Sequence, residues 1–211
     1  MKRLARSTVM FIAGMFALAM AAIPAAAQAG SASSSAQAPL ALMPLPSSIT
    51  RGEGAFTVTP AGGAPSTFTY NYGQTHDARL EAAVRRSVIR LGRTCGGEVL
   101  RSTIDHPAPS TASLLINVAA PGEPVQTIDE DESYQLSVTP QGATLTAPTD
   151  LGAMHGLETL LQLATMEQGA CVLPAVTIHD VPRFRWRGFM LDVSRHFEPV
   201  ASVERALDGM A

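Results

Sequence analysis

The most informative segment for the fold class of this 211-residue chain is Ser133-Tyr-Gln-Leu-Ser-Val-Thr-Pro-Gln-Gly-Ala-Thr-Leu-Thr-Ala147. Apolar and polar residues alternate from Tyr134 to Val138, and Thr139-Pro-Gln-Gly142 separates them from a second apolar and polar alternation. A period of two is typical of a strand with one buried face, and the Pro and Gly between the halves favour a turn. The stretch therefore predicts a β-hairpin that needs another layer packed against one face.

Two segments have the apolar spacing of amphipathic helices. The first runs from His76 to Leu91, and we expect Thr75 to cap it. Its apolar positions are Leu80, Val84, Val88 and Leu91. The second is expected to begin at Asp150 as its cap and to continue to Ala164. Each helix therefore has an apolar face that can cover the hairpin.

Further strands are expected over 55–59, 68–72, 113–118 and 175–179. This order of elements predicts an α+β domain over residues 40–181, with a mixed sheet that carries two helices on one face. From residue 182 the pattern changes. Phe189–Val193 is typical of a parallel barrel strand, and Pro199–Met210 of the helix that follows it. We therefore expect residues 182–211 to be the first β/α unit of a truncated (β/α)8 barrel.

The N-terminal residues have the composition of an export signal. A basic start and an apolar stretch precede two A-x-A cleavage triplets that end at Ala27 and Ala29, so residues 1–29 are predicted to be a signal peptide and 30–39 a disordered linker. The mature chain would carry 12 basic and 18 acidic residues. We expect a periplasmic or secreted protein with no nucleic-acid partner and no membrane contact after cleavage.

Cys95 and Cys171 each follow an expected helix. Export favours a disulfide, but the spacing does not give the geometry, so a pair and two free thiols both remain open. No second ligand stands at a helical or hairpin spacing from His106 or His155, and no phosphate-binding loop is present. We expect no metal and no cofactor.

Three fragments, taken in order, carry a resemblance to a known family. They are Gly152-Ala-Met-His-Gly-Leu-Glu-Thr-Leu-Leu-Gln-Leu163, Ile178-His-Asp-Val-Pro-Arg-Phe-Arg-Trp-Arg-Gly188 and Met190-Leu-Asp-Val-Ser-Arg-His-Phe197. Together they resemble the junction between the accessory domain and the barrel of family 20 glycoside hydrolases, the β-N-acetylhexosaminidases. The clear match covers about residues 133–211, with weaker similarity back to Leu40.

The resemblance implies removal of terminal β-linked N-acetylglucosamine or N-acetylgalactosamine from chitooligosaccharides or glycans. The implied reaction retains configuration and uses the acetamido oxygen of the substrate as the nucleophile. The family's catalytic Asp-Glu pair lies later in the barrel than Ala211, so we expect no catalytic residue in this chain and no activity from it alone. Asp129-Glu-Asp-Glu132 is expected to be a solvated loop, because runs of like charge usually avoid burial.

Two arginines are candidates for sugar binding, Arg187 before the expected strand and Arg195 after it. Active sites of (β/α)8 barrels form at the C-terminal ends of strands, which favours Arg195. The resemblance implies that Arg195 holds hydroxyls of the terminal sugar; the alternative is that it only braces a barrel carboxylate. Asp192 either holds Arg195 or forms a polar layer of the barrel, and we favour the first. His196 is expected to be a supporting corner residue.

The residues just before the expected strand are predicted to join the two domains. They are Arg183, Arg185, Arg187 and Trp186. Two other functions remain open. One is a non-catalytic exported module that binds glycans or partners and has lost its barrel. The other is a different barrel glycosidase, such as an α-glucuronidase, which the Ser-Arg-His corner disfavours.

Overall fold

A computed structural model describes residues 39–62, 66–72, 77–96, 99–103 and 112–210. The predicted signal peptide and nearly all of the predicted linker lie outside these residues, as does Thr75. No helix within the described ranges is both long enough and apolar enough to cross a bilayer.

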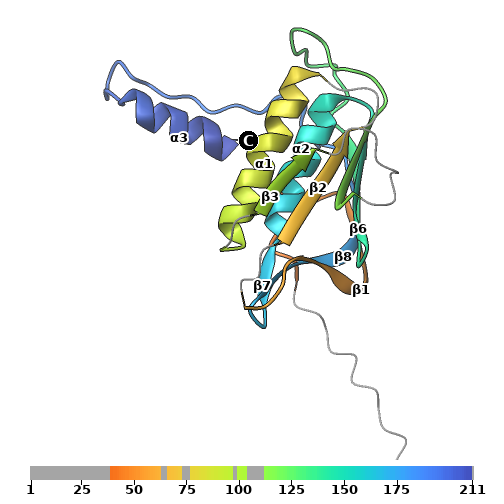
Figure 1. The fold of residues 1–211 in the computed structure, drawn as a ribbon. Helices are drawn as coiled ribbons and strands as arrows, with labels where there is room; N and C mark the ends of the chain where they lie inside the picture. Colours follow the sequence, from red (N-terminus) through yellow and green to blue (C-terminus); the bar gives the residue numbers. More distant parts are fainter. Residues whose placement is uncertain (1–38, 63–65, 73–76, 97–98, 104–111, 211) are drawn as a thin grey trace, which may run out of the picture. The chain divides into compact units, whose positions relative to one another are not determined.

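The sheet is mixed, as the sequence predicted. Its strands are β1 (Ser48–Thr59), β2 (Ser66–Tyr72), β3 (Val99–Thr103), β4 (Leu114–Val118), β5 (Tyr134–Thr139), β6 (Gly142–Ala147), β7 (Thr165–Glu167) and β8 (Ala170–Asp180). They are ordered β1-β8-β5-β6-β4-β2-β3, and β7 pairs with β8 (Figure 1). Neighbours from β1 to β6 are antiparallel, and those from β6 to β3 are parallel. The predicted hairpin is β5 and β6, with Thr139 paired to Gly142.

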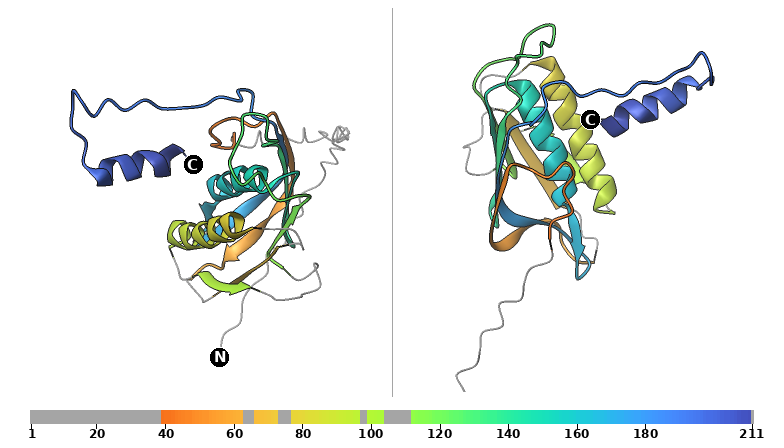
Figure 2. Two further views of the ribbon diagram at one scale, coloured as in Figure 1. Left: turned by 90° about the horizontal axis from the view of Figure 1, so that it is seen from above. Right: turned by 180° about the vertical axis from the view of Figure 1, so that it is seen from behind.

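Two helices, α1 (Ala78–Thr94) and α2 (Asp150–Leu163), lie side by side on one face of the sheet (Figure 2). The predicted apolar face of α1 is buried. In β5 and β6, the residues on the sheet face away from the helices are mostly polar. The largest fully buried side chains are Phe68, Leu80, Leu91, Leu114, Ile116, Leu136, Leu145, Leu157, Leu160, Leu163, Leu173 and Ile178. These side chains form one core between the helices and the sheet, so the predicted α+β architecture is confirmed.

Both predicted helix caps were wrong by one or two residues. Asp77, not Thr75, caps α1, because its side chain accepts a hydrogen bond from the N–H of Leu80. Thr149, not Asp150, caps α2 and accepts from the N–H of Gly152. Asp150 is instead the first residue of α2 and is fully buried. Thr and Asp are both good caps, so composition alone did not choose between neighbours.

Close approach of α2 to the sheet depends on two glycines. A Cβ at Gly156 would lie 2.3 Å from Cδ1 of Leu145, and one at Gly152 would lie 2.2 Å from the carbonyl oxygen of Ser133. Real side chains do not come this close, so only glycine fits here without a shift of its neighbours. The two glycines let α2 lie directly on the hairpin.

A disulfide joins Cys95, just after α1, to Cys171 in β8, with a Cα–Cα distance of 5.2 Å. The two residues are 76 positions apart in sequence, and both are buried. The bond ties one end of the helical layer to the sheet.

The expected barrel strand over Phe189–Val193 is not present. In the described residues, 189–193 form no strand, whereas the predicted helix is observed as α3 (Val200–Met210). A barrel strand is held by hydrogen bonds to a neighbour on each side. No other described strand pairs with residues 189–193. A helix makes its backbone hydrogen bonds internally, which is why α3 forms while no residue of it is buried.

Candidate functional site

A tight polar turn surrounds the predicted sugar contact, Arg195. Oδ1 of Asp192 accepts from the N–H groups of Ser194 at 3.1 Å and Arg195 at 3.2 Å. Oδ2 of Asp192 lies 2.5 Å from Nε of Arg195. The N–H and the guanidinium of Arg195, together with the N–H of Ser194, outweigh the small effect of burial and lower the pKa of Asp192. The carboxylate is therefore ionised at neutral pH and holds one edge of the arginine.

Arg195 presents the rest of its guanidinium outward, because its side chain is 87% exposed. A guanidinium has five N–H donors in a planar fork, and only the Nε donor is directed to Asp192 here. Such a fork can donate to two neighbouring hydroxyl groups at once. The turn therefore displays a hydrogen-bond donor suited to a polyhydroxylated ligand.

His196 closes this turn. Its Nδ1 lies 2.7 Å from the carbonyl oxygen of Arg195, and its N–H donates to the carbonyl oxygen of Asp192 at 3.4 Å. The imidazole is exposed. His196 is therefore placed as a corner residue beside Arg195, and its supporting role stays a prediction.

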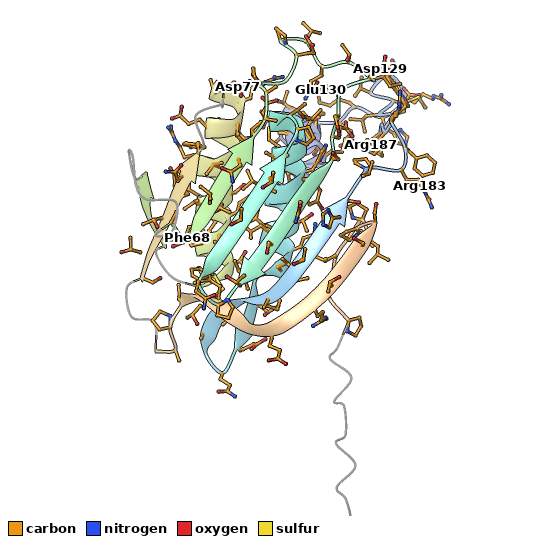
Figure 3. The ribbon with its side chains drawn as sticks, turned by 90° about the vertical axis from the view of Figure 1, so that its right-hand side faces the viewer. Phe68, Asp77, Asp129, Glu130, Arg183 and Arg187 are labelled. Carbon is orange, nitrogen blue, oxygen red and sulfur yellow. A yellow bond between two sulfur atoms is a disulfide. The ribbon has the colours of Figure 1, made fainter. Side chains whose placement is uncertain are left out.

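Two arginines of residues 182–191, the segment before the turn, pair with carboxylates in the loop that precedes β5. Nη1 of Arg185 lies 2.8 Å from Oδ1 of Asp129, and Nη2 of Arg187 contacts Oε2 of Glu132. Figure 3 shows Asp129 and Arg187 at the same end of the domain. As expected, residues 129–132 lie in a surface loop, and none of them is buried. The ion pairs of Asp129 and Glu132 with arginines were not expected. The arginines that supply the counter-charges follow Asp129 and Glu132 by 56 and 55 positions, which no local pattern reveals.

Glu132 is the recessed member of these pairs, with its side chain 20% exposed. Nε2 of His155, on α2, lies 3.9 Å from the same carboxylate oxygen. Burial lowers the pKa of His155, and the nearby Arg187 adds to this effect, although Glu132 opposes it. His155 is therefore neutral at neutral pH, and Arg187 is the charged partner of Glu132.

A buried carboxylate that the sequence did not reveal lies at the N-terminal ends of the two helices. Asp150 is fully buried; its Oδ2 lies 3.2 Å from Nη2 of Arg79, and its Oδ1 accepts from the N–H of Gly122 at 2.8 Å. Arg79 also pairs with Asp77 at 2.9 Å. Burial, followed by the adjacent Asp77, raises the pKa of Asp150. An Asp in the first turn of a helix is common, and only the fold shows that this one is buried.

The apolar side chains around the Asp192–Arg195 turn, in residues 184–197, are exposed. Exposed fractions are 81% for Trp186, 87% for Met190 and 84% for Phe197. Trp186 was expected to pack between domains, and in the described residues it remains on the surface. Arg183 lies over the ring of Phe184, with 4.7 Å between the guanidinium carbon and the ring centroid. The segment is thus held by its charged residues and not by its apolar ones.

Nowhere in the described ranges do three His, Cys, Asp or Glu side chains gather in a way that could hold a metal ion. The residues of the Asp192–Arg195 turn offer hydrogen-bond donors and charge, centred on Arg195.

Comparison with protein families gives two matches that follow each other along the chain. The family described as "beta-acetyl hexosaminidase like" matches residues 42–163, more than half of the chain. The one described as "Glycosyl hydrolase family 20, catalytic domain" matches residues 184–211, which include Arg187, Asp192 and Arg195.

Related proteins from animals and bacteria match in the same way. The bovine beta-hexosaminidase subunit alpha is 30% identical over 178 residues, which are 81% of this chain and 33% of the bovine one. A beta-hexosaminidase of Akkermansia muciniphila is 42% identical over 115 residues, which are 54% of this chain and 22% of the relative. The chain thus spans about a third or less of the length of these curated relatives.

Solved structures show the same partial overlap. A chitobiase of Flavobacterium johnsoniae is 38% identical, has a TM-score of 0.68 and covers 80% of this chain, while the match takes up 25% of the chitobiase. The N-acetyl-beta-hexosaminidase of Streptomyces plicatus, in complex with Thio-NAglucal, is 29% identical with a TM-score of 0.56 and covers 80% of this chain and 31% of its own.

Proposed function

Because the chain belongs to family 20 of the glycoside hydrolases, we propose that the whole protein is an exported β-N-acetylhexosaminidase. It removes terminal β-linked N-acetylglucosamine or N-acetylgalactosamine from chitooligosaccharides or glycans, with retention and with the substrate acetamide as nucleophile. The observation that carries the proposal is the Asp192–Arg195 turn, which lies in the stretch matched by the catalytic-domain description.

Within this function, Arg195 binds hydroxyls of the terminal sugar and Asp192 holds its guanidinium. The ionised carboxylate of Asp192 fixes the Nε edge of Arg195, and the remaining donors point to solvent, where a sugar ring would lie. His196 braces the turn through the backbone of Arg195. These residues bind substrate, and the acid-base step requires groups from the rest of a catalytic domain.

The 211 residues alone are proposed to be inactive. The family 20 catalytic domain matches this chain only over residues 184–211, whereas a complete (β/α)8 barrel takes about 250 residues. We expect the isolated chain to release no p-nitrophenol from p-nitrophenyl N-acetyl-β-glucosaminide. Turnover by a preparation free of other hexosaminidases would contradict this.

The test of the proposed function starts from the gene. The reading frame beyond Ala211 is sequenced, and the complete product is assayed with β-linked N-acetylglucosaminide and N-acetylgalactosaminide substrates. The α-anomer of each substrate serves as the control. Hydrolysis of the β-anomers with a β-configured first product supports the proposal. A complete product that hydrolyses none of them contradicts it.

Export is tested separately. The sequence of residues 1–29 favours cleavage after Ala27 or Ala29. N-terminal sequencing of the protein from the periplasm or the medium should therefore begin at Gln28 or Gly30. A protein that keeps Met1 and stays inside the cell would contradict export.

The second candidate is a non-catalytic exported module, and it is favoured by the compact α+β core, which closes without residues 182–211. A stop codon directly after Ala211, together with binding of the isolated chain to chitin or glycans, would support this module. An open frame and hydrolysis would support the enzyme.

A further inference from the structure

Contacts of the main chain on both sides of Glu132 hold its backbone in place, independently of Arg187. The N–H of Ser133 donates to Oδ1 of Asp131 at 2.9 Å, and Oγ1 of Thr149 donates to the carbonyl oxygen of Asp131 at 2.6 Å. The main chain at Glu132 and Ser133 also lies against Gly152, where a Cβ would clash. The backbone that carries Glu132 is therefore locked to the first turn of α2.

The segment that leads to Arg195 begins at an equally fixed point. β8 ends at Asp180, which pairs with Tyr134 at the start of β5. Oδ1 of Asp180 accepts from the N–H and the hydroxyl of Ser47, both at 3.0 Å. Residues 181–187 then run from this point to Arg187, which contacts Glu132. Glu132 lies just before β5, and Asp180 ends β8, the antiparallel neighbour of β5. Both residues therefore lie at the same end of these two strands, and residues 181–187 are held at both of their ends.

The guanidinium of Arg187 is oriented for this contact. Its Nη1 donates to the carbonyl oxygen of Phe184, within its own segment, at 2.5 Å, while Nη2 contacts Glu132. A pair in which one carboxylate is 20% exposed is less screened by water than a pair on the open surface. The Asp129–Arg185 pair is of the second kind, with exposed fractions of 78% and 73%.

We propose that Glu132 is a positioning residue: by holding Arg187, it fixes where the segment that carries Asp192 and Arg195 leaves the accessory domain. Asp192 follows Arg187 by only five positions, so a shift at Arg187 is passed on to the sugar-binding turn. The accessory domain thereby contributes to substrate binding without contacting the substrate. This inference rests on the proposed function for its effect on catalysis, but not for its effect on the segment.

Trp186 supplies a probe for the segment, because it is the only Trp in the chain, adjoins Arg187 and is exposed. The steady-state fluorescence anisotropy of the 211-residue chain is measured for wild type, Glu132→Gln, Arg187→Gln and the double variant. We expect each single change to lower the anisotropy, and the double change to lower it no further, because both remove the same contact. Asp129→Asn is the matched control. Its pair with Arg185 is exposed on both sides and largely screened by water, so this change is expected to lower the anisotropy much less than Glu132→Gln does.

The same variants in the complete enzyme test positioning. Glu132→Gln is expected to raise KM roughly two- to fivefold with kcat nearly unchanged, which is the range of a partly screened ion pair. Asp129→Asn is expected to leave both constants unchanged. Anisotropy and KM that both match wild type in Glu132→Gln would overturn the proposal, and so would a lowered anisotropy with an unchanged KM. If the complete wild-type protein shows no hexosaminidase activity, the proposed function fails, and the anisotropy cycle still decides whether Glu132 holds the segment.

Discussion

Nε of Arg195 lies 2.5 Å from Oδ2 of Asp192, three residues earlier in the chain, while Oδ1 of the same carboxylate accepts two backbone N–H groups. The aspartate thus fixes both the backbone and the side chain of the arginine. This geometry leaves the outer edge of the guanidinium available to a ligand. It gives Arg195 a defined direction even though the side chain is highly exposed.

Arg195→Ala in the complete enzyme is expected to lower kcat/KM about 10- to 150-fold, because it removes hydrogen bonds from a charged group to the sugar. Arg187→Ala is the matched change. It is expected to lower the free energy of unfolding by about 1 kcal/mol and kcat/KM by no more than about fivefold. Steady-state kinetics and urea unfolding measure the two effects. The reverse pattern would show that Arg187, and not Arg195, contacts the sugar.

Cys95→Ser is expected to lower the free energy of unfolding by about 2–4 kcal/mol, because the disulfide closes a loop of 76 residues and restricts the unfolded chain. Denaturant unfolding of the oxidised proteins measures the change. Cys171→Ser and the double variant should show the same loss, since each breaks the same bond. A reductant should lower the stability of wild type and leave that of the variants unchanged; equal sensitivity would argue against the bond.

Stability at acid pH is expected to depend on Asp77. Burial disfavours its charged form, but hydrogen bonds with the N–H of Leu80, with the Asp150 side chain and with Arg79, together with the charge of Arg79, lower its pKa to about 2. A lowered pKa in the folded chain stabilises it above the ordinary value near 3.8, and this contribution is lost as the pH falls towards 2. Asp77→Asn keeps a helix cap without the titration. It should therefore be less stable than wild type at pH 6 by about 1–2 kcal/mol.

This difference should be mostly lost at pH 2, where about half of Asp77 in the folded chain is protonated. Asp150 acts in the opposite direction, because its raised pKa means that the folded chain binds its proton more tightly than the unfolded chain does. Its protonation therefore favours the folded state as the pH falls. The part of this effect that comes from burial remains in both proteins, whereas the part that comes from the charge of Asp77 is lost in Asp77→Asn. Urea unfolding at pH 6, 4 and 2 measures the difference, and a constant gap across this range would contradict the role given to Asp77.

Gly152→Ala is expected to lower the free energy of unfolding by about 1–3 kcal/mol, because the new methyl group would press on the carbonyl oxygen of Ser133 and the backbone would have to move. Gly209→Ala in α3 is the control, since nothing lies within 4 Å of its added Cβ. It should cause no loss, because Ala favours a helix over Gly. Thermal unfolding measures both, and equal midpoints for the two variants would contradict the tight contact.

Periodic patterns in the sequence predicted the hairpin, both core helices and α3. Strands β3 and β7 were missed, because each is short and lacks an alternating apolar pattern. The expected strand over Phe189–Val193 has the right composition, but a strand forms only beside a partner. Helices were therefore easier to predict than strands, because their hydrogen bonds are local.

The Asp192–Arg195 turn was also partly predictable. Asp192, Arg195 and His196 lie within five residues, so a short motif contains the whole contact. The contact between Glu132 and Arg187 could not be predicted, because its members are 55 positions apart. Each of them also belongs to a charge-rich run that offers several other possible partners.

Local spacing and short motifs in the sequence were enough to predict the helix and sheet layers and the family, and both predictions are confirmed. Arg195 as the sugar contact comes from the same motifs and stays a prediction. The packed fold was needed to show that Cys95 pairs with Cys171, that Asp150 is buried against Arg79, and that Glu132 contacts Arg187. Each of these contacts joins residues at least 55 positions apart. Their meeting depends on how helices and strands pack around one core, and no local pattern encodes that packing.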